Sequence, residues 1–198
     1  MTEIISKTAQ IHSCDIHFLE AGSRDNRAVI LLHGMKFQAA TWEETGTLQK
    51  LAEAGFHAVA IDMPGFGKSP ACSLDQDTVL QHFIRDRGQR DFLVGPSMGG
   101  RIALEFAINH PSSLAGLVLI GSVGVQENRN RLAAINTPTL IVWGGEDRIS
   151  PMDNCELLHT SIPGSRKIII DGAPHPCYLD NSETWHRELI HFLNTTTD

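Results

Sequence analysis

The chain has 198 residues, 41% of them hydrophobic, with 16 basic and 23 acidic side chains and a formal net charge of −7. We expect residues 1–198 to form a single domain with one substantial core. The acidic balance argues against a nucleic-acid partner unless basic side chains gather in one patch. The densest basic stretch, 85–90, is interrupted by Asp86 and is expected to be a solvated helix face.

The first 22 residues show period-two patterning around "CDIHFLE", which predicts an antiparallel hairpin at one edge of a sheet. Six short apolar runs then have strand character: 28–33, 57–61, 92–94, 114–120, 139–143 and 167–170. Helical spacing appears between them and at the end: 42–54, 78–87, 98–109, 153–161 and 183–193.

This alternation of strand and helix predicts an α/β fold, with a mostly parallel, doubly wound sheet and right-handed crossovers. Residues 121–138 leave room for only one short helix, expected around 128–134. We therefore expect no cap domain, and we find no internal repeat or linker.

The N-terminus lacks the apolar run of a secretory signal, and no segment approaches the ~20 apolar residues that span a bilayer. The four cysteines lie far apart, with no C-x-x-C pair and no zinc-finger spacing. They are Cys14, Cys72, Cys155 and Cys177. We expect reduced thiols, a cytoplasmic protein, no membrane contact and no bound metal.

The stretch "IDMPGFGKS" (61–69) resembles a phosphate-binding loop at first sight. Such a loop requires G-x-x-x-x-G-K-[ST], and its first glycine position is occupied by Asp62. The dinucleotide pattern G-x-G-x-x-G also fails, because Pro70 replaces the third glycine. We interpret the stretch as a tight turn after a strand, and rank nucleotide binding a distant third among the functions.

The stretch "FLVGPSMGGRIALEFA" contains Gly95-Pro96-Ser97-Met98-Gly99, a G-x-S-x-G motif between a strand and a helix. A strand that turns abruptly into a helix holds the residue at the apex in a strained conformation and lifts its hydroxyl above the sheet. Ser97 is therefore the expected nucleophile.

A serine nucleophile needs a base, and the base needs an acid that holds its tautomer. His175 and Asp147 follow two successive strands, where a doubly wound sheet presents loops to a common crevice. They are the expected base and acid. Other acids lie close in sequence and remain alternatives to Asp147: Glu146, Asp153 and Asp171.

The oxyanion of an acyl transfer needs backbone donors, and we expect the N–H groups of Met35 and Met98 to supply them. His33 is expected to order the turn before Met35. The acyl pocket is expected to be small and made by loop residues: Met35, Phe37, Met98, Ser122, Val123, Ile149 and Tyr178. Cys177 is expected at its rim, more as a packed thiol than a reactive one.

These motifs resemble the α/β-hydrolase superfamily over nearly the whole chain: H-G after one strand, D-x-P-G-x-G-x-S after the next, G-x-S-x-G, then Asp and His. More narrowly, "LLHGMKFQAATWEETGTLQKLAEAGFHAVAIDMPGFGKS" and "GAPHPCYLDNSETWHRELIHFL" are similar to the abhydrolase domain-containing protein 14 family. The resemblance implies a compact, lidless serine hydrolase. It also implies activity on small esters, or removal of acetyl groups from lysine with coenzyme A as the acceptor.

We therefore expect a serine hydrolase or acyl transferase that acts on small acyl substrates and needs no metal or redox cofactor. Water or another acceptor, with coenzyme A as one candidate, would release the acyl group. Two alternatives stay open. One is a protein-interaction module on a lidless hydrolase scaffold with weak or vestigial activity, because fold alone does not decide function. The other is acetyl-lysine deacetylation by transfer to coenzyme A.

Overall fold

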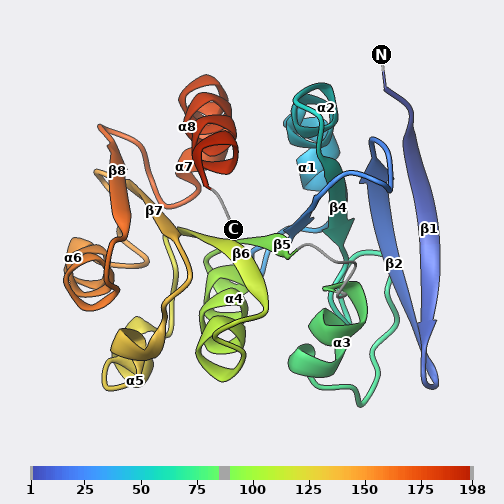
Figure 1. Ribbon diagram of the computed structural model, residues 1–198, viewed down its shortest axis with the longest axis horizontal. Helices are drawn as coiled ribbons and strands as arrows, with labels where there is room; N and C mark the ends of the chain where they lie inside the picture. The colour runs from blue at the N-terminus through green and yellow to red at the C-terminus, as the bar shows by residue number, and fades with distance from the viewer. Residues whose placement is uncertain (1, 85–89, 197–198) are drawn as a thin grey trace.

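One sheet of eight strands runs through the whole molecule in the computed structural model, which describes residues 2–84 and 90–196 (Figure 1). Its strand order is β1-β2-β4-β3-β5-β6-β7-β8. The strands are β1 (Ile4–Ile11), β2 (Cys14–Ala21), β3 (Ala28–Leu31), β4 (His57–Ile61), β5 (Asp91–Pro96), β6 (Leu114–Ile120), β7 (Thr139–Gly144) and β8 (Arg166–Ile170). The predicted N-terminal hairpin is confirmed, since β1 and β2 pair antiparallel at one edge, and β3 to β8 form the parallel part.

Helices cover both faces of this sheet, as predicted (Figure 1). On one side lie α1 (Ala40–Glu44), α2 (Thr47–Glu53), α7 (Cys177–Asp180) and α8 (Ser182–Thr195). On the other lie α3 (Gln76–Phe83), α4 (Met98–Asn109), α5 (Val125–Asn128) and α6 (Met152–Ser161), with a 3-10 turn at Leu132–Ala134. Residues 121–138 hold only α5 and this turn, so no cap domain is inserted there.

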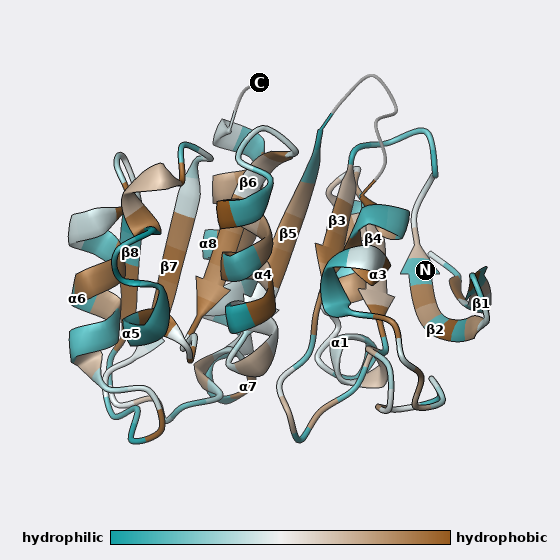
Figure 2. Ribbon diagram, turned by 90° about the horizontal axis from the view of Figure 1, so that it is seen from below, coloured by the Kyte–Doolittle hydropathy of each residue, from teal (hydrophilic) through white to brown (hydrophobic). Residues whose placement is uncertain are grey.

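The core has two layers because successive strand side chains point to opposite faces. In β5, for example, Leu93 belongs to the cluster under α3 and α4, whereas Phe92 and Val94 belong to the cluster under α2 and α8. The parallel strands are apolar over most of their length (Figure 2), although β8 begins with Arg166 and Lys167 and is half-buried. This burial on both faces is what the continuous hydrophobic runs in the sequence predicted.

Three predicted helices differ from the structure by more than two residues. In place of the short helix expected around 128–134, α5 ends at Asn128 and a 3-10 turn follows at Leu132–Ala134. The predicted helix 42–54 divides into α1 and α2, because Gly46 adopts a left-handed conformation with φ of 74° and interrupts the helix. The helix predicted at 78–87 begins earlier, at Gln76, where the Asp75 side chain accepts a hydrogen bond from the Thr78 N–H. Its predicted end, and most of the basic stretch at 85–90, lie outside the described residues.

The prediction that all four cysteines are reduced is wrong for Cys14 and Cys72, which form a disulfide. They lie 58 residues apart in sequence, but the segment after β4 returns beside the start of β2 and brings their Cα atoms to 6.0 Å. Sequence spacing cannot show that approach. Cys155 and Cys177 are free and buried. Within the described residues, no helix has the length and apolar character needed to cross a membrane.

Candidate active site

The site lies at the carboxyl ends of the parallel strands, where the direction of winding reverses. β3 pairs with β4 on one side and with β5 on the other, although β4 lies between β3 and β5 in the chain. Loops that leave β3 and β5 therefore diverge and open a crevice between them. Gly34 follows β3 and Ser97 follows β5, so the two predicted loops meet at this crevice.

Ser97 occupies a strained turn between β5 and α4. Its φ of 52° and ψ of −113° lie outside the regions that non-glycine residues normally adopt. The Ser97 N–H donates to the Ile120 carbonyl (2.9 Å), and the Ser97 carbonyl accepts from the Arg101 and Val123 N–H groups (3.0 and 3.3 Å). These bonds fix both ends of the residue and keep it in the strained conformation.

The glycines around Ser97 are required by close backbone approaches. A Cβ on Gly95 would collide with the Gly99 carbonyl, and a Cβ on Gly99 would lie 2.7 Å from the His33 carbonyl oxygen. The two glycines of the motif therefore let helix α4 start directly over the end of β5, next to the loop that follows β3.

His175 and Asp147 form a hydrogen-bonded pair at the ends of β8 and β7. The His175 Nδ1–H donates to Asp147 Oδ2 (2.7 Å), since a carboxylate can only accept. The side chain of Asp147 is 1% exposed, and its other oxygen, Oδ1, accepts hydrogen bonds from the N–H groups of Ile149 (2.8 Å) and Ser150 (2.9 Å). With Nδ1 protonated, Nε2 of the neutral ring carries the lone pair that a general base needs.

Gly121 makes room for this pair, and the sequence analysis did not single it out. It directly follows β6 and has φ of 50°, and a Cβ there would lie 3.0 Å from Asp147 Oδ2 and 3.2 Å from His175 Nδ1. The signal for it in the sequence is a glycine directly after the apolar run 114–120. Its role depends on how β6 and β7 pair, which the sequence does not state.

Ser97 and His175 line the same cavity, but the hydrogen bond between them is not formed. The Nε2 atom of His175 is buried and has no hydrogen-bond partner among the described residues. A serine hydroxyl moves by rotation about one bond, and catalytic hydrogen bonds often close only when substrate is bound. His175 is therefore oriented by Asp147 and has a ring nitrogen that is unpaired within the described part of the chain, and it lines the cavity that Ser97 also lines.

The cavity at Ser97 has a volume of about 410 Å³ and a largely apolar wall. Its lining residues are Gly34, Met35, Lys36, Phe37, Ser97, Met98, Val123, Ile149, His175 and Pro176. Of the residues predicted to form the pocket, Met35, Phe37, Met98, Val123 and Ile149 are thus brought together. The volume falls within the usual range for small-molecule sites.

Ser122, Cys177 and Tyr178 were also predicted at the pocket, and the structure places them elsewhere. Ser122 is fully buried beneath α4. Tyr178 packs between Trp42 and Trp185, with ring centroids 5.0 and 6.3 Å away, because the apolar face of α7 turns into the core. Cys177 is fully buried in that core, and its burial and the nearby Asp147 charge raise the pKa of its thiol to about 12.

His33 ties the loop after β3 to the turn after β4. Its Nδ1–H donates to the Gly34 carbonyl (2.8 Å), and its Nε2 accepts from the Met63 N–H (3.2 Å). These bonds fix one neutral tautomer, and burial lowers the pKa of the ring. A Cβ on Gly34 would lie 3.7 Å from the Ser97 Cβ, so the backbone leading to Met35 runs close to Ser97.

The fold of the chain has close counterparts among solved structures. A Thermoplasma acidophilum protein described as a predicted CIB-like hydrolase superposes with a TM-score of 0.90 at 23% identity, over 98% of this chain and 99% of that one. A 2-hydroxy-6-oxo-6-phenylhexa-2,4-dienoate hydrolase from Rhodococcus superposes with a TM-score of 0.87 at 20% identity, over 98% of this chain and 100% of that one. At these identities the likeness concerns the α/β-hydrolase fold alone.

Sequence relatives narrow the classification. The family described as Serine aminopeptidase, S33 matches residues 23–128. ABHD14B of Rattus norvegicus, named as a candidate protein-lysine deacylase, is 36% identical over 96% of both chains. ABHD14A of Danio rerio is 38% identical over 84% of this chain and 64% of its own length. The chain belongs to the ABHD14 family of α/β-hydrolases. It is a hydrolase-family protein, as the sequence motifs predicted.

In this ABHD14-family chain, the alternative acids lie apart from the histidine. Glu146, Asp153 and Asp171 are exposed, and none of them shares a hydrogen bond with His175 in the described structure. Asp147 is the carboxylate that holds the ring.

The turn at 61–69 is built around a carboxylate rather than a phosphate. Asp62 accepts from the N–H groups of Ala39 (2.7 Å) and Lys68 (2.9 Å) and from His17 Nδ1 (2.7 Å). The Ser6 hydroxyl donates to His17 Nε2 (2.8 Å). Ser6, His17 and Asp62 are thus hydrogen-bonded in series, and these bonds join β1 and β2 to the turn.

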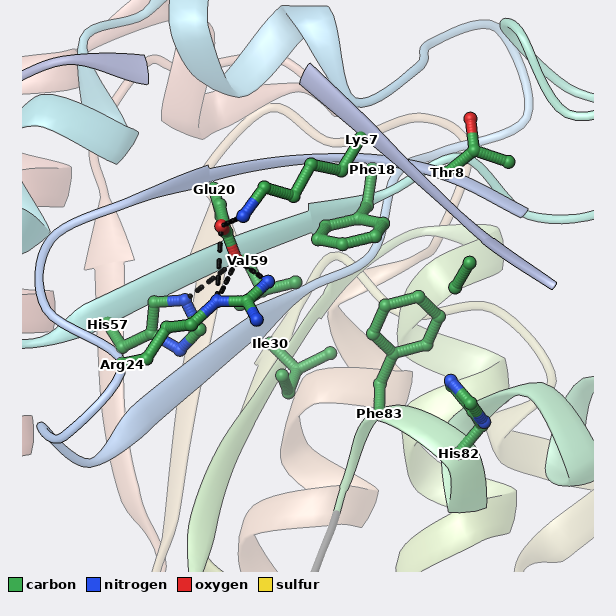
Figure 3. Close-up of a pocket in the computed structure, with 11 residues that line it drawn as sticks. Lys7, Thr8, Phe18, Glu20, Arg24, Ile30, His57, Val59, His82 and Phe83 are labelled. Carbon is green, nitrogen blue, oxygen red and sulfur yellow. Dashed lines mark hydrogen bonds and ion pairs between the residues drawn. The ribbon is translucent and has the colours of Figure 1, made fainter. Parts of the chain in front are cut away.

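A second cavity of about 270 Å³ lies between β2, β4 and α3, and none of the predicted catalytic residues line it (Figure 3). One of its lining residues is Glu20, whose carboxylate accepts hydrogen bonds from Lys7, Arg24 (2.9 Å) and His57 (3.2 Å). Burial raises the pKa of Glu20, but the hydrogen bonds from Arg24, Lys7 and His57 outweigh it and lower the pKa to about 2. This cluster joins the N-terminal hairpin to β4.

Proposed function

We propose that the protein hydrolyses or transfers small acyl groups through Ser97, His175 and Asp147. One observation carries the proposal: His175 is held by Asp147, its Nε2 has no hydrogen-bond partner among the described residues, and His175 lines the same cavity as Ser97. A strained serine, an oriented imidazole and a buried carboxylate in this order are the parts of a nucleophilic acyl-transfer site.

In the first half of the proposed reaction, Ser97 Oγ attacks the acyl carbonyl while its proton passes to His175 Nε2. The carbonyl oxygen becomes an oxyanion, which the N–H groups of Met35 and Met98 would bind. The tetrahedral intermediate then collapses, and the proton moves from His175 to the departing alcohol or amine. The acyl group stays on Ser97 as an ester.

In the second half, water gives a proton to His175 Nε2 and attacks this ester, and the carboxylic acid leaves as Ser97 regains its proton. Another acceptor with an acidic hydrogen, such as the thiol of coenzyme A, would take the acyl group by the same steps. Asp147 keeps its charge throughout and stabilises the imidazolium.

The family supports acylated lysine as one substrate class, because ABHD14B of Rattus norvegicus is named as a candidate protein-lysine deacylase. The cavity supports small esters equally well, since its wall is apolar and it is not covered by an inserted domain. We therefore propose a panel of 4-nitrophenyl esters, thioesters and acetylated lysine peptides, each with and without coenzyme A.

The deciding experiment compares Ser97→Ala with a matched control, Ser113→Ala. Ser113 directly precedes β6 and therefore lies at the amino-terminal ends of the parallel strands, whereas Ser97 follows the carboxyl end of β5. Both variants should keep the wild-type circular dichroism and thermal midpoint. Only Ser97→Ala should lose fluorophosphonate labelling and 4-nitrophenyl acetate turnover. A folded Ser97→Ala protein that still labels and turns over at the wild-type rate would refute the proposal. A folded wild-type protein without Ser97-dependent turnover would favour an interaction module.

A further inference from the structure

The cavity at Ser97 carries one lysine on an otherwise uncharged, mainly apolar wall. Apart from His175, Lys36 is the sole ionisable side chain among the described residues that line it. Lys36 is exposed, and its ammonium makes no ion pair or hydrogen bond with any part of the chain that the structure describes. It is two residues from Gly34, whose backbone approaches Ser97. A cation thus stands without a protein counter-ion at the mouth of the site.

The charges around this mouth differ from those of the whole chain. The protein carries a formal net charge of −7, yet no Asp or Glu lines the cavity. The side chain of Asp147 is 1% exposed, and its carboxylate accepts hydrogen bonds from His175 and from two backbone N–H groups. Exposed Arg148 directly precedes another lining residue, Ile149. An anion that enters the cavity would therefore meet Lys36 and no Asp or Glu among the described lining residues.

The apolar part of the mouth is equally unusual. Met35 and Ile149 are 68% and 66% exposed, and both belong to the wall of this cavity. Among the described residues, Ile5 is the one other large hydrophobic side chain that is exposed. Each of the two lies directly beside a cation in sequence, Met35 next to Lys36 and Ile149 next to Arg148. The mouth therefore offers both apolar contact and positive charge.

We propose that the site selects acyl substrates that carry a negative charge near the scissile carbonyl, and that Lys36 is the residue that recognises this charge. The inference rests on the proposed acyl chemistry at Ser97. The negative charge that we propose is a carboxylate, which can be part of the acyl group or of the leaving group. Lys36 acts on binding and takes no part in proton transfer.

The test compares matched anionic and neutral esters on each side of the scissile bond. On the acyl side, 4-nitrophenyl hydrogen adipate is compared with 4-nitrophenyl hexanoate. On the leaving-group side, 4-acetoxybenzoate is compared with 4-acetoxybenzamide. Each kcat/KM is divided by the rate constant for hydroxide hydrolysis of the same ester, which removes differences in intrinsic reactivity. The pair that shows the preference identifies the part of the substrate that bears the charge.

An ion pair at about 4 Å in a solvated site corresponds to about a fivefold preference. We expect the wild type to favour the anionic member of one pair by this factor at low salt, and the preference to shrink as salt screens the charge. Lys36→Gln should remove the preference, so that the anionic-to-neutral ratio of kcat/KM falls to about one. Lys36→Arg should restore it. Lys68→Gln changes another exposed lysine outside the cavity and should behave as wild type.

Equal preference in wild type and Lys36→Gln, or no preference in the wild type for either pair, would overturn the inference while leaving Ser97-dependent turnover intact. A readout without turnover separates the two proposals. NMR titration of Ser97→Ala uses amide counterparts of both pairs: N-propyl adipamic acid with N-propyl hexanamide, and 4-acetamidobenzoate with 4-acetamidobenzamide. In one of the two pairs the acid should bind more tightly, and adding Lys36→Gln should abolish the difference. Equal binding within both pairs would count against a role for Lys36 even if no ester is turned over.

Discussion

His175 Nδ1 lies 2.7 Å from Asp147 Oδ2 across a sequence separation of 28 residues. The two residues follow β7 and β8, which pair in parallel and bring their carboxyl ends to the same edge of the sheet. The pair fixes which nitrogen of His175 is free to accept a proton. The chemistry proposed for Ser97 depends on this orientation.

Replacing Asp147 with Asn should remove the charge that stabilises the imidazolium and permit the wrong tautomer of His175. We expect kcat to fall by about 10⁴ with little change in fold. Asp153→Asn, a change at an exposed carboxylate on α6, is the control and should keep wild-type kcat. A variant at position 147 that retained more than about a tenth of the wild-type kcat would contradict the assignment of this acid.

Replacing Gly121 with Ala should displace the Asp147–His175 pair, since the new Cβ would lie 3.0 Å from Asp147 Oδ2 at a φ of 50°. We expect kcat to fall at least about tenfold and the free energy of unfolding to fall by about 1–2 kcal/mol. Gly164→Ala is a matched control, because Gly164 has φ of 70° and open space around its Cβ position. It should lose similar stability and keep kcat. Equal kcat in the two variants would show that Gly121 has no positioning role.

Because of the Glu20 cluster, the free energy of unfolding should decrease as the pH falls below 4.5. The pKa of Glu20 is lowered from 4.5 to about 2, so its ionised form stabilises the fold above pH 4.5 and this stabilisation is lost as the pH falls toward 2. That shift corresponds to at most about 3 kcal/mol.

Urea unfolding at several pH values tests this expectation. Glu20→Gln should be less stable than wild type at pH 7 and should lose less stability between pH 4.5 and 2. Glu44→Gln, at an exposed position on α1, should follow the wild-type curve. Parallel curves for wild type and Glu20→Gln would exclude the proposed coupling.

The disulfide between Cys14 and Cys72 closes a loop with a sequence separation of 58 residues. On the chain-entropy argument, removing it should lower the free energy of unfolding by up to about 4 kcal/mol. A reductant should shift the urea midpoint of the wild type toward that of Cys14→Ser/Cys72→Ser, and should not move the midpoint of the double variant. An unreduced wild type as unstable as the double variant would show that the cross-link does not stabilise the fold.

Much of the fold follows from local sequence because parallel strands buried on both faces must be apolar throughout. The runs at 57–61 and 114–120 coincide with β4 and β6 for this reason. The helix predicted at 42–54 fails at Gly46, where hydrophobic periodicity continues but a left-handed residue interrupts the hydrogen bonding. Periodicity reports which side of a segment is apolar and does not report φ.

The site was predicted less completely than the fold. Ser97 carries a local signal, because the turn requires glycines at 95 and 99 whatever surrounds it. The predicted positions of Ser122 and Tyr178 assumed that loop residues near the histidine and the elbow point outward. Instead Tyr178 packs in an aromatic cluster with Trp185 and with Trp42, which is distant from both in the chain.

The sequence alone determined the alternation of strand and helix, the ABHD14 resemblance and the strained turn at Ser97, because each depends on residues close together in the chain. Tertiary structure alone decided which carboxylate holds His175, that Gly121 leaves space for this pair, that Cys14 meets Cys72 and that Lys36 lines an apolar cavity. These facts depend on distances between segments. Such distances are set when the strands pair and the loops close over the edge of the sheet.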